Sequence, residues 1–522
     1  MATEILESYL GGRWSRGQGV ETELVDPTNG NVLATASAKG LDFKSALDFA
    51  RTRGGPALRA LNYAERAKLV GGVADVLAAN RARYEEIAIA NSGNTRIDAA
   101  IDIDGGIGTL KYYARLGAPL GAAKALLDEK PVRLAKAENF QAIHLLTPRY
   151  GVAVHINAFN FPSWGLWEKA ACALLSGMPM LAKPASSTCW LSHQMVRDVI
   201  AANVLPEGAL SLICGGTGDL LDQVTSDDVI AFTGSSDTAN RIVAHPIVLH
   251  RGARVNIEAD SVNAALLAPG VAAATPAFDA FVKEVAREMT QKAGQKCTAI
   301  RRVFVPAERA GAVAEALAAR LAKTTVGDPR SEATRMGPLV NRVQQKAALE
   351  GIGRLAREAK FVAGGADAPK LDGIDATRSA FVAPTLLKLE GEGRAVHETE
   401  VFGPCATIVP YKDDADAFAL AARGGGSLVA SVYGQDRDFL ARAVTELSSS
   451  HGRVLAVEPS IADVHTGHGI VMPQCHHGGP GRAGNGAELG GLHGLRFYHQ
   501  RVAVQGSTDL LAALQASAAP AH

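Results

Sequence analysis

A single cysteine with polar residues in front of it is the first candidate for chemistry in this chain. Cys297 lies in the stretch GQKCTAI, directly before the β-branched run RRVFV. A thiolate is a strong nucleophile, and a neighbouring lysine such as Lys296 can favour its formation. The commonest fate of a free cysteine is burial as a small apolar side chain, and Cys172 and Cys214 lie in apolar runs that fit that description. Spacing alone therefore leaves Cys297 open between a nucleophile and a buried thiol.

Polar side chains at the ends of two predicted strands could assist such a nucleophile. Glu258 ends the apolar stretch RVNIEA, where desolvation would raise the pKa of its carboxyl group toward the range of a general base. Asn157 and Asn160 follow the strand in HINAFNFPSW, and an amide held there could donate a hydrogen bond to an oxyanion. Each has a structural alternative: a buried glutamate paired with a basic residue, and an asparagine that satisfies loop backbone.

Two glycine-rich stretches are candidates for binding groups. AFTGSS at 231–236 leads from a strand into a Gly-Ser turn whose N–H groups could face a phosphate, although an ordinary strand-to-helix turn has the same pattern. VHTGHGIVMPQCHHGGPG at 464–481 combines Cys475 with His465, His468, His476 and His477. Because these spacings match no zinc pattern, we expect a glycine-rich loop near a pocket and no metal site.

The elements that must position these residues form two α/β series. Short β-rich runs alternate with helix-length stretches from about residue 150, and the alternation repeats after residue 301. This pattern predicts two doubly wound lobes with mostly parallel sheets, divided between about 259 and 290. The expected strands are 151–158, 178–183, 209–214, 229–234, 254–259, 301–305, 406–412 and 427–434, and the expected helices are 63–90, 167–176, 192–204 and 308–325. In the first helix, the spacing predicts a buried stripe of Leu69, Val73, Val76 and Leu77.

Two stretches fit neither lobe. ENFQAIHLLTPRYG at 138–151 and LRFYHQRVAVQG at 495–506 alternate in polarity like strands. They could extend the sheets of the lobes or form projecting edges for subunit pairing, and the pattern favours neither. The final SAAPAH, residues 517–522, is predicted to be loose.

Composition limits the class of protein. The chain has 522 residues, of which 47% are hydrophobic and 20% charged, with 53 basic and 53 acidic residues. These values are typical of a globular enzyme of two or three lobes, and the balanced charge argues against nucleic acid or an anionic membrane as a partner. No secretory signal, bilayer-spanning apolar run or CxxC pair is present in the sequence. We therefore expect a cytoplasmic protein with free thiols.

The order of the motifs is more specific than any one of them. Asn160, the Gly-Ser turn, Glu258, Cys297 and EVFGP at 400–404 together resemble the aldehyde dehydrogenase superfamily over nearly the whole chain. The resemblance implies the α/β aldehyde dehydrogenase fold, with two doubly wound, Rossmann-like lobes and a small β arm. It places a nicotinamide cofactor domain at 1–137 and 152–268, a catalytic domain at 269–494, and an oligomerisation arm at 138–151 and 495–510. Subunit pairing in a homodimer thereby becomes the preferred interpretation of the two stray stretches.

The resemblance also implies a role for each matched residue. Cys297 matches the nucleophile, Asn160 the oxyanion donor, and Glu258 the base that activates the hydrolytic water. Lys169 and Glu488 resemble the residues that pass protons to and from that base. Six positions match those that hold the cofactor: Lys183, Ser186, Gly234, Ser235, Glu400 and Phe402.

Departures from the family pattern bear on the cofactor. Many members that prefer NAD have a glutamate three residues after the matched lysine, and here that position is Ser186. A carboxylate would repel a 2′-phosphate, whereas a hydroxyl leaves room and can donate to it. The resemblance therefore favours NADP over NAD. Ala239 replaces the usual second glycine after FTGS, which leaves the geometry around the pyrophosphate open.

Other departures bear on the substrate. EADS, GQKCTAIRR, HINAFNFPSW and HGGPGRAG resemble a subgroup that oxidises semialdehydes attached to coenzyme A during aerobic breakdown of aromatic acids such as benzoate. The expected substrate is a CoA-linked aldehyde, oxidised at its distal end to a free acid. The alternatives are a general aliphatic or aromatic aldehyde dehydrogenase using NAD(P), an acylating enzyme that passes the thioester to free coenzyme A, and a non-catalytic binding or structural relative.

Overall fold

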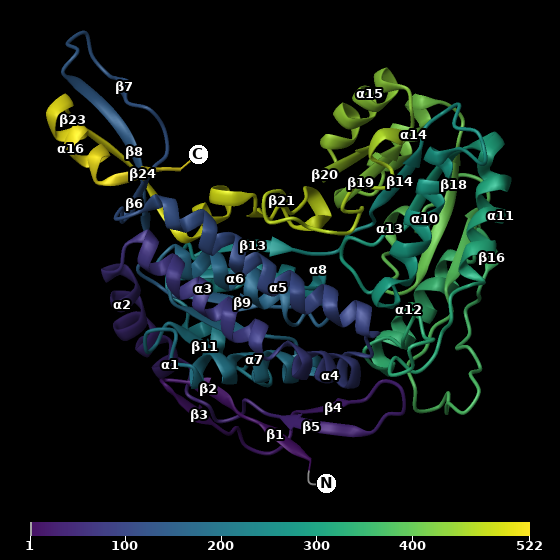
Figure 1. Ribbon diagram of the computed structural model, residues 1–522, viewed down its shortest axis with the longest axis horizontal. Helices are drawn as coiled ribbons and strands as arrows, with labels where there is room; N and C mark the ends of the chain where they lie inside the picture. The colour runs from purple at the N-terminus through teal and green to yellow at the C-terminus, as the bar shows by residue number, and fades with distance from the viewer. Residues whose placement is uncertain (1–2, 522) are drawn as a thin grey trace.

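Three parts make up the chain in the computed structural model, which describes residues 3–521. Figure 1 shows a purple-to-teal part on the left, a green part on the right, and an arm that projects at the upper left. A seven-stranded sheet lies at the centre of each of the first two parts, and a five-stranded sheet forms the arm. No helix among these residues has the length and apolar character needed to cross a bilayer.

The first large sheet confirms five predicted strands. Its order is β13-β12-β9-β10-β11-β2-β3, and the first five strands of that order are parallel. The bounds are β2 (Ser8–Leu10), β3 (Arg13–Ser15), β9 (Ala153–Ile156), β10 (Met180–Lys183), β11 (Leu210–Leu212), β12 (Val229–Thr233) and β13 (Arg254–Glu258). The chain order reverses between β9 and β12, and ligands of α/β sheets bind beyond the carboxyl ends of strands at such a point.

The helices around this sheet differ in one respect from the sequence-based prediction. The helix predicted over 63–90 is two helices that meet at Asn80, whose φ of −106° and ψ of 9° interrupt the regular turn. The buried face of the first one carries Val70, Val73 and Leu77, whereas Leu69 and Val76 are only partly buried. The main helices here are α3 (Tyr63–Ala79), α4 (Arg81–Ser92), α5 (Arg96–Gly117), α6 (Trp164–Leu175) and α7 (Cys189–Ala201).

The second large sheet has the order β16-β17-β18-β15-β14-β19-β20, with only β16 antiparallel to its neighbour. Its strands are β14 (Ala264–Leu267), β15 (Arg302–Pro306), β16 (Ala359–Ala363), β17 (Thr385–Leu389), β18 (Cys405–Tyr411), β19 (Ser427–Tyr433) and β20 (His451–Val457). The surrounding helices are α10 (Pro276–Thr290), α11 (Ala310–Leu321), α12 (Arg342–Leu355), α14 (Asp414–Ala422) and α15 (Arg437–Ser448). The chain passes from one sheet to the other between Glu258 and Ala264, at the start of the predicted boundary.

The two stray stretches pair with each other in the arm. β8 (Phe140–Pro148) and β23 (His499–Ser507) run antiparallel over nine residue pairs, from His499 opposite Pro148 to Ser507 opposite Phe140. They therefore do not extend a sheet of either lobe. β6 (Ala125–Leu127), β7 (Val132–Arg133), β24 (Ala518–Pro520) and α16 (Thr508–Ala516) complete the arm.

The prediction of a loose tail is wrong for the described residues up to 521. β24 pairs in parallel with β6, and Ala519 and Ala521 are buried. A short alanine-rich segment gives little pattern, so its pairing is decided by the free edge that β6 offers. The remaining elements are β1 (Glu4–Leu6), β4 (Thr22–Val25), β5 (Val32–Ala36), α1 (Phe43–Phe49), α2 (Gly55–Ala60), α8 (Ser236–Val243), α9 (Pro246–Leu249), α13 (Ala395–Glu398), β21 (His476–His477) and β22 (Glu488–Leu489).

Candidate active site

The backbone before Cys297 adopts left-handed conformations. Lys292, Ala293 and Gly294 have φ values of 52°, 51° and 69°. A Cβ atom on Gly294 would lie 2.2 Å from the carbonyl oxygen of Gly403, so only glycine fits there. Two consecutive non-glycine residues in this region cost conformational energy, which the surrounding contacts must offset. The cysteine is thus presented by a tightly specified turn.

Two buried side chains hold this turn in place. The guanidinium of Arg301 donates to the carbonyl oxygens of Gly403 and Gly294, both at 2.8 Å. The Nδ2 atom of Asn263, at the start of the second sheet, donates to the carbonyl oxygen of Cys297 at 2.7 Å. Sequence analysis missed both residues, because an arginine or asparagine beside a strand has no pattern that marks it as buried.

Lys296 does not act on the thiol in this arrangement. Its ammonium lies 2.8 Å from a carboxylate oxygen of Glu288 and 2.8 Å from the amide oxygen of Gln291. Both members of the ion pair are buried. The lysine that precedes the nucleophile therefore belongs to a structural ion pair behind the turn.

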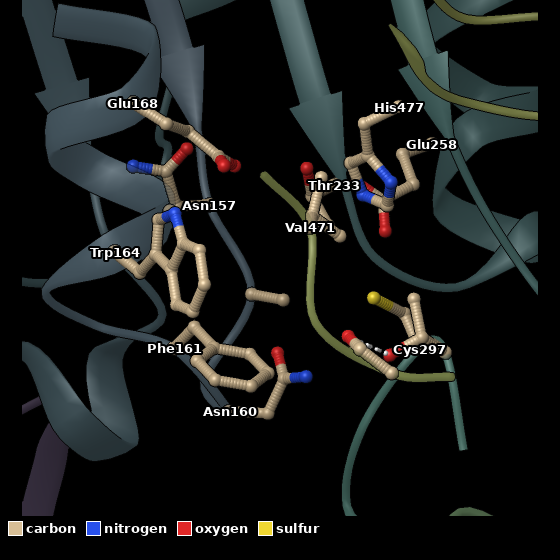
Figure 2. A pocket seen from close by; sticks show the side chains of 14 residues that line it. Asn157, Asn160, Phe161, Trp164, Glu168, Thr233, Glu258, Cys297, Val471 and His477 are labelled. Carbon is tan, nitrogen blue, oxygen red and sulfur yellow. Dashed lines mark hydrogen bonds and ion pairs between the residues drawn. The ribbon is translucent and has the colours of Figure 1, made fainter. Parts of the chain in front are cut away.

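Cys297 faces a narrow pocket of about 50 Å³. Figure 2 shows Phe161 and Trp164 on one side of it and Cys297 on the other. Asn160 lies beside Phe161, with its amide nitrogen directed toward the side of Cys297. The other lining residues include Asn157, Glu168, Thr233, Glu258, Thr298, Gly469, Val471 and His477. The structure thus brings together the three residues predicted to carry the chemistry.

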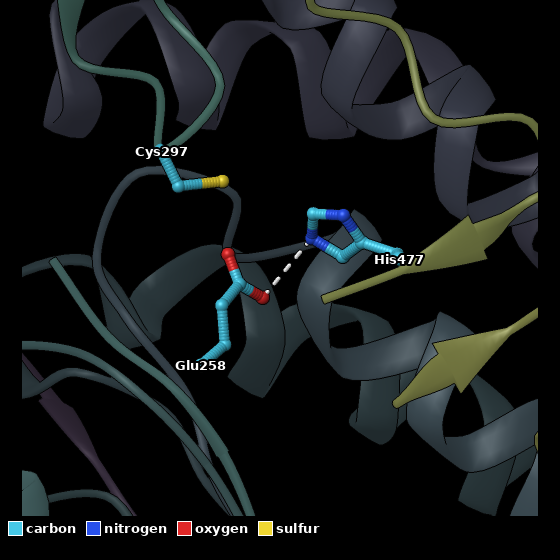
Figure 3. A group of neighbouring side chains, drawn as sticks. All are labelled: Glu258, Cys297 and His477. Carbon is cyan, nitrogen blue, oxygen red and sulfur yellow. Dashed lines mark ion pairs between the residues drawn. The ribbon is translucent and has the colours of Figure 1, made fainter. Parts of the chain in front are cut away.

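The protonation of Cys297 follows from its surroundings. Burial raises the pKa of the thiol well above its ordinary value, and the negative charge of Glu258 raises it further. Figure 3 shows one carboxylate oxygen of Glu258 directed toward the sulfur and the other toward His477. The oxygen on the sulfur side, Oε1, is buried, and the thiol of Cys297 can donate a hydrogen bond to it. It is therefore placed to accept a proton in the pocket.

The prediction of a raised pKa for Glu258 is wrong. Burial does raise the pKa, but the charge and hydrogen bond of His477 and the charge of Lys169 lower it more, to about 2. Nε2 of His477 lies 3.1 Å from Oε2 of Glu258, and both side chains are almost inaccessible to solvent. The sequence-based argument included the desolvation of the carboxylate but not this buried partner.

Lys169 and Glu488, which resemble the pair that passes protons to and from the base, lie in contact with each other. Nζ of Lys169 lies 3.0 Å from Oε2 of Glu488 and 3.2 Å from Oε1 of Glu168. Burial alone would lower the pKa of Lys169, but the two carboxylates raise it well above its ordinary value. Glu168 was not predicted; burial raises its pKa to about 7. We call Glu168, Lys169, Glu258, His477 and Glu488 the acid–base cluster.

A second, larger cavity of about 860 Å³ adjoins the pocket at Asn160, Glu258 and Cys297. All six residues predicted to hold a cofactor line it: Lys183, Ser186, Gly234, Ser235, Glu400 and Phe402. It offers an amine, hydroxyls, a helix N-terminus at α8, a carboxyl group and an aromatic ring, and its volume suits a large ligand. These donors fit a dinucleotide with phosphates and ribose hydroxyls. Ala239 is buried and does not line the cavity, so its methyl group leaves the cavity wall unchanged.

Comparison with known proteins supports the resemblance to aldehyde dehydrogenases that the motifs indicated. The aldehyde dehydrogenase family model matches residues 14–504. The chain belongs to the aldehyde dehydrogenase family. It is 53% identical over 478 residues to 3,4-dehydroadipyl-CoA semialdehyde dehydrogenase of Aromatoleum evansii, covering 91% of this chain and 93% of that protein.

Solved structures share the fold of this aldehyde dehydrogenase. An aldehyde dehydrogenase from Bacillus cereus, determined with NAD+, has a TM-score of 0.82 at 22% identity, covering 97% of each chain. A variant betaine aldehyde dehydrogenase from Staphylococcus aureus, also with NAD+, has a TM-score of 0.82 at 21% identity, covering 97% of this chain and 98% of the other. The predicted fold class is thereby confirmed, and the chain is an oxidoreductase of a family whose members bind nicotinamide cofactors.

The cofactor side of this aldehyde dehydrogenase differs in one detail from expectation. The hydroxyl of Ser186 donates to the carbonyl oxygen of Gly215 at 2.9 Å and lies 3.5 Å from Nζ of Lys183. Its proton is thus already engaged, and Ser186 would have to rotate to donate to a phosphate. Burial raises the pKa of Glu400 to about 7 despite the nearby Arg301. Phe402 packs edge-to-face on Phe159, with ring centroids 5.6 Å apart.

The segment 464–481 forms the expected glycine-rich loop near a pocket. Of its histidines, His477 alone joins Glu258 and Cys297 in a trio whose possible ligand atoms all lie within 4.8 Å of one another. These atom types also bind zinc, and the absence of a metal in the working enzyme stays a prediction. His468 instead shares a hydrogen bond with Ser431 on β19, at 2.8 Å.

Alkylation of Cys297 should show its raised pKa directly. We expect iodoacetamide to label it slowly at pH 7 and about tenfold faster for each pH unit up to at least pH 9, because only the thiolate reacts. Peptide mass spectrometry measures the rate, with the exposed Cys475 in the same sample as an internal control. A rate for Cys297 that levels off near neutral pH would contradict the expectation.

Proposed function

We propose that this enzyme oxidises 3,4-dehydroadipyl-CoA semialdehyde to the carboxylic acid with NADP, through a thioester on Cys297. The proposed substrate rests on the 53% identity, over 91% of the chain, to 3,4-dehydroadipyl-CoA semialdehyde dehydrogenase. The narrow pocket agrees with it, because its apolar lining residues Phe161, Trp164 and Val471 suit a thin linear aldehyde chain. The bulky coenzyme A group would then remain outside the pocket.

The first half of the reaction forms a covalent intermediate. The thiol of Cys297 would pass its proton to Oε1 of Glu258, and the cluster behind Glu258 would return that proton to solvent before hydrolysis. The sulfur forms a bond to the aldehyde carbon while the carbonyl electrons move onto oxygen. The amide of Asn160 and the backbone N–H of Cys297 would donate hydrogen bonds to that oxyanion. A bound nicotinamide would supply a hydride acceptor for the same carbon, and loss of that hydride would leave a thioester on Cys297. The six cavity residues, Lys183 and Glu400 among them, would hold the cofactor beside the sulfur.

The second half releases the acid. Glu258 takes a proton from water through its Oε1, the water oxygen bonds to the thioester carbon, and the carbon–sulfur bond breaks. Lys169 and Glu488 lie directly behind and would return the proton toward solvent. A water-activating base in the pocket supports hydrolysis over transfer of the thioester to free coenzyme A.

The arm supports assembly of a homodimer. β23 ends the arm sheet on one side, and it presents Val502 at 41% exposure. Phe140 at the start of β8 is also 41% exposed. A sheet edge with exposed apolar side chains is suited to pairing with a second copy of the chain. A cytoplasmic homodimer with a small-molecule substrate is the assembly that we propose.

An activity matrix tests the proposed function. Initial rates of cofactor reduction are compared for NADP and NAD, each with a CoA-linked semialdehyde, a free aldehyde of equal chain length and an aromatic aldehyde. We expect kcat/KM at least about tenfold higher for the CoA-linked substrate with NADP. Equal efficiency on free aldehydes would make the enzyme a general aldehyde dehydrogenase, and no reduction at all would point to a non-catalytic relative. Formation of a new acyl-CoA when free coenzyme A is added would instead identify an acylating enzyme.

Two substitutions separate the halves of the reaction. Cys297→Ala should abolish turnover while cofactor binding, measured by fluorescence titration, is retained. Glu258→Gln should give at most one equivalent of reduced cofactor per active site in stopped flow and then turn over at least about 100-fold more slowly, because water lacks its base. Normal steady-state turnover of Glu258→Gln would show that another carboxylate activates water.

Cofactor preference is tested at position 186. Ser186→Glu places a carboxylate beside Lys183 in the cavity and should shift the ratio of kcat/KM values toward NAD by about tenfold or more. Ser187→Glu is the matched control, because it adds the same charge one residue away and Ser187 does not line the cavity. An unchanged ratio in Ser186→Glu would mean that the 2′-phosphate is recognised elsewhere.

A further inference from the structure

His477 is an ionisable side chain in the pocket that has no place in the mechanism above. His477 lines the pocket, and its Nε2 lies 3.1 Å from Oε2 of Glu258. Its side chain is 6% exposed and that of Glu258 is 5% exposed, so the contact lies away from bulk solvent. The contact leaves only Oε1 of Glu258 for the sulfur side, as Figure 3 shows. His477 therefore determines which carboxylate oxygen can accept a proton from water.

The glycine-rich segment places His477 at this point. β21, which holds His477, pairs with β22 so that His477 lies opposite Glu488. The loop between them packs on the strand that carries Glu258: a Cβ atom on Gly486 would lie 2.3 Å from the carbonyl oxygen of Ile257. The backbone N–H of Ala259 also donates to the carbonyl oxygen of Ala483 at 3.0 Å. The glycines thus permit the close approach that brings His477 to Glu258.

The charges around His477 are unbalanced without it. Within the acid–base cluster, Glu168, Glu258 and Glu488 are three carboxyl groups, and Lys169 is the one permanent cation. These three carboxyl groups all act on His477 and favour its protonated form, whereas burial opposes it. The neighbouring His476 and the thiol of Cys297 are the other titratable groups close to it. A buried cluster of this kind favours a second positive charge.

We propose that His477 positions Glu258 for catalysis and that loss of the His477 proton releases Glu258 as a base. With His477 charged, the carboxylate is held in a buried ion pair and accepts a proton from water poorly. With His477 neutral, its Nε2–H still donates to Oε2, so the Glu258 carboxylate keeps its orientation. The positive charge that made Glu258 a poor proton acceptor is then gone. His477 is thus a positioning residue that sets the pH range of the enzyme.

The inference rests on the proposed function, since it concerns hydrolysis of the Cys297 thioester. In that step a water proton passes to Oε1 of Glu258, a carbon–oxygen bond forms, and the carbon–sulfur bond breaks with its electrons on sulfur. Rates of hydrolysis should therefore rise with pH as His477 loses its proton, in a limb centred above the ordinary histidine value of 6.5. Below that limb the ion pair with Glu258 suppresses the step.

Hydrolysis can be isolated from oxidation with 4-nitrophenyl acetate as the probe. Its acetyl group transfers to the thiol with release of 4-nitrophenolate, and no cofactor is required. Intact-protein mass spectrometry then follows loss of the acetyl group from pH 5.5 to pH 9 in buffers with EDTA, so that metal at the trio is excluded. Peptide mapping identifies the acetylated residue. Failure to acetylate Cys297 in the wild type would overturn the proposed nucleophile, independently of any role of His477.

The variants separate charge from hydrogen bonding. His477→Gln keeps an amide donor without a titrating group: we expect a plateau rate within about threefold of wild type and an acid limb moved to lower pH, where Glu258 itself takes up a proton. His477→Leu removes the donor as well and should slow hydrolysis by about 10- to 100-fold. His477→Asn, which also has an amide, repeats the first test if His477→Gln fails to fold.

A matched control and a clear contrary result complete the test. His476→Gln removes the adjacent imidazole, which has no contact with Glu258 among the described residues, and should leave the limb and the plateau unchanged. If His477→Gln keeps the wild-type acid limb while Cys297 is still acetylated, His477 does not control Glu258 and the inference is overturned. A thermal stability measurement on each variant distinguishes such a result from loss of folding.

Discussion

The site depends on one electrostatic constraint: the thiol of Cys297 and three carboxyl groups are buried together. Each negative charge in a buried pocket raises the pKa of the others, as the thiol of Cys297 beside Glu258 shows. Lys169 offsets two of the carboxylates through contacts of 3.0 and 3.2 Å, and His477 offsets the third. Removal of either basic side chain would leave a buried carboxylate without its hydrogen-bond partner. The packing around the pocket therefore keeps two basic side chains next to three acidic ones.

Each of the two large sheets contributes residues to this site. Glu258 ends a strand of the first sheet, whereas Cys297 lies on the turn that enters the second sheet at β15. The chain-order reversal between β9 and β12 places the loops that carry Asn160 and Gly234 on either side of the cavity. The narrow pocket and the larger cavity thus meet where the carboxyl ends of the first sheet face the second part of the molecule.

The sequence predicted most of the elements, because strands with continuous apolar runs are local signals. It also predicted that Asn160, Glu258 and Cys297 act together, and the structure brings these three residues to one pocket. It could not predict the break at Asn80, which depends on one residue leaving helical geometry. The direction of the pKa shift of Glu258 was also beyond it, because His477 comes from a segment more than 200 residues away that only folding brings near. Arg301 and Asn263 escaped notice for a similar reason: their importance lies in the carbonyl oxygens that they bind.

The pairing of β8 with β23 has a consequence for synthesis on the ribosome. These partners lie at distant places in the chain, and Glu488 and His477 also come from its last part. During translation the long strand β8 emerges early and keeps an unpaired edge until nearly the whole polypeptide has been made. The acid–base cluster likewise stays incomplete, so the nascent chain holds Cys297 without the full set of groups that would make it an enzyme. Slow elongation would therefore lengthen a period of vulnerability to aggregation, and activity would appear only after the last segment has folded.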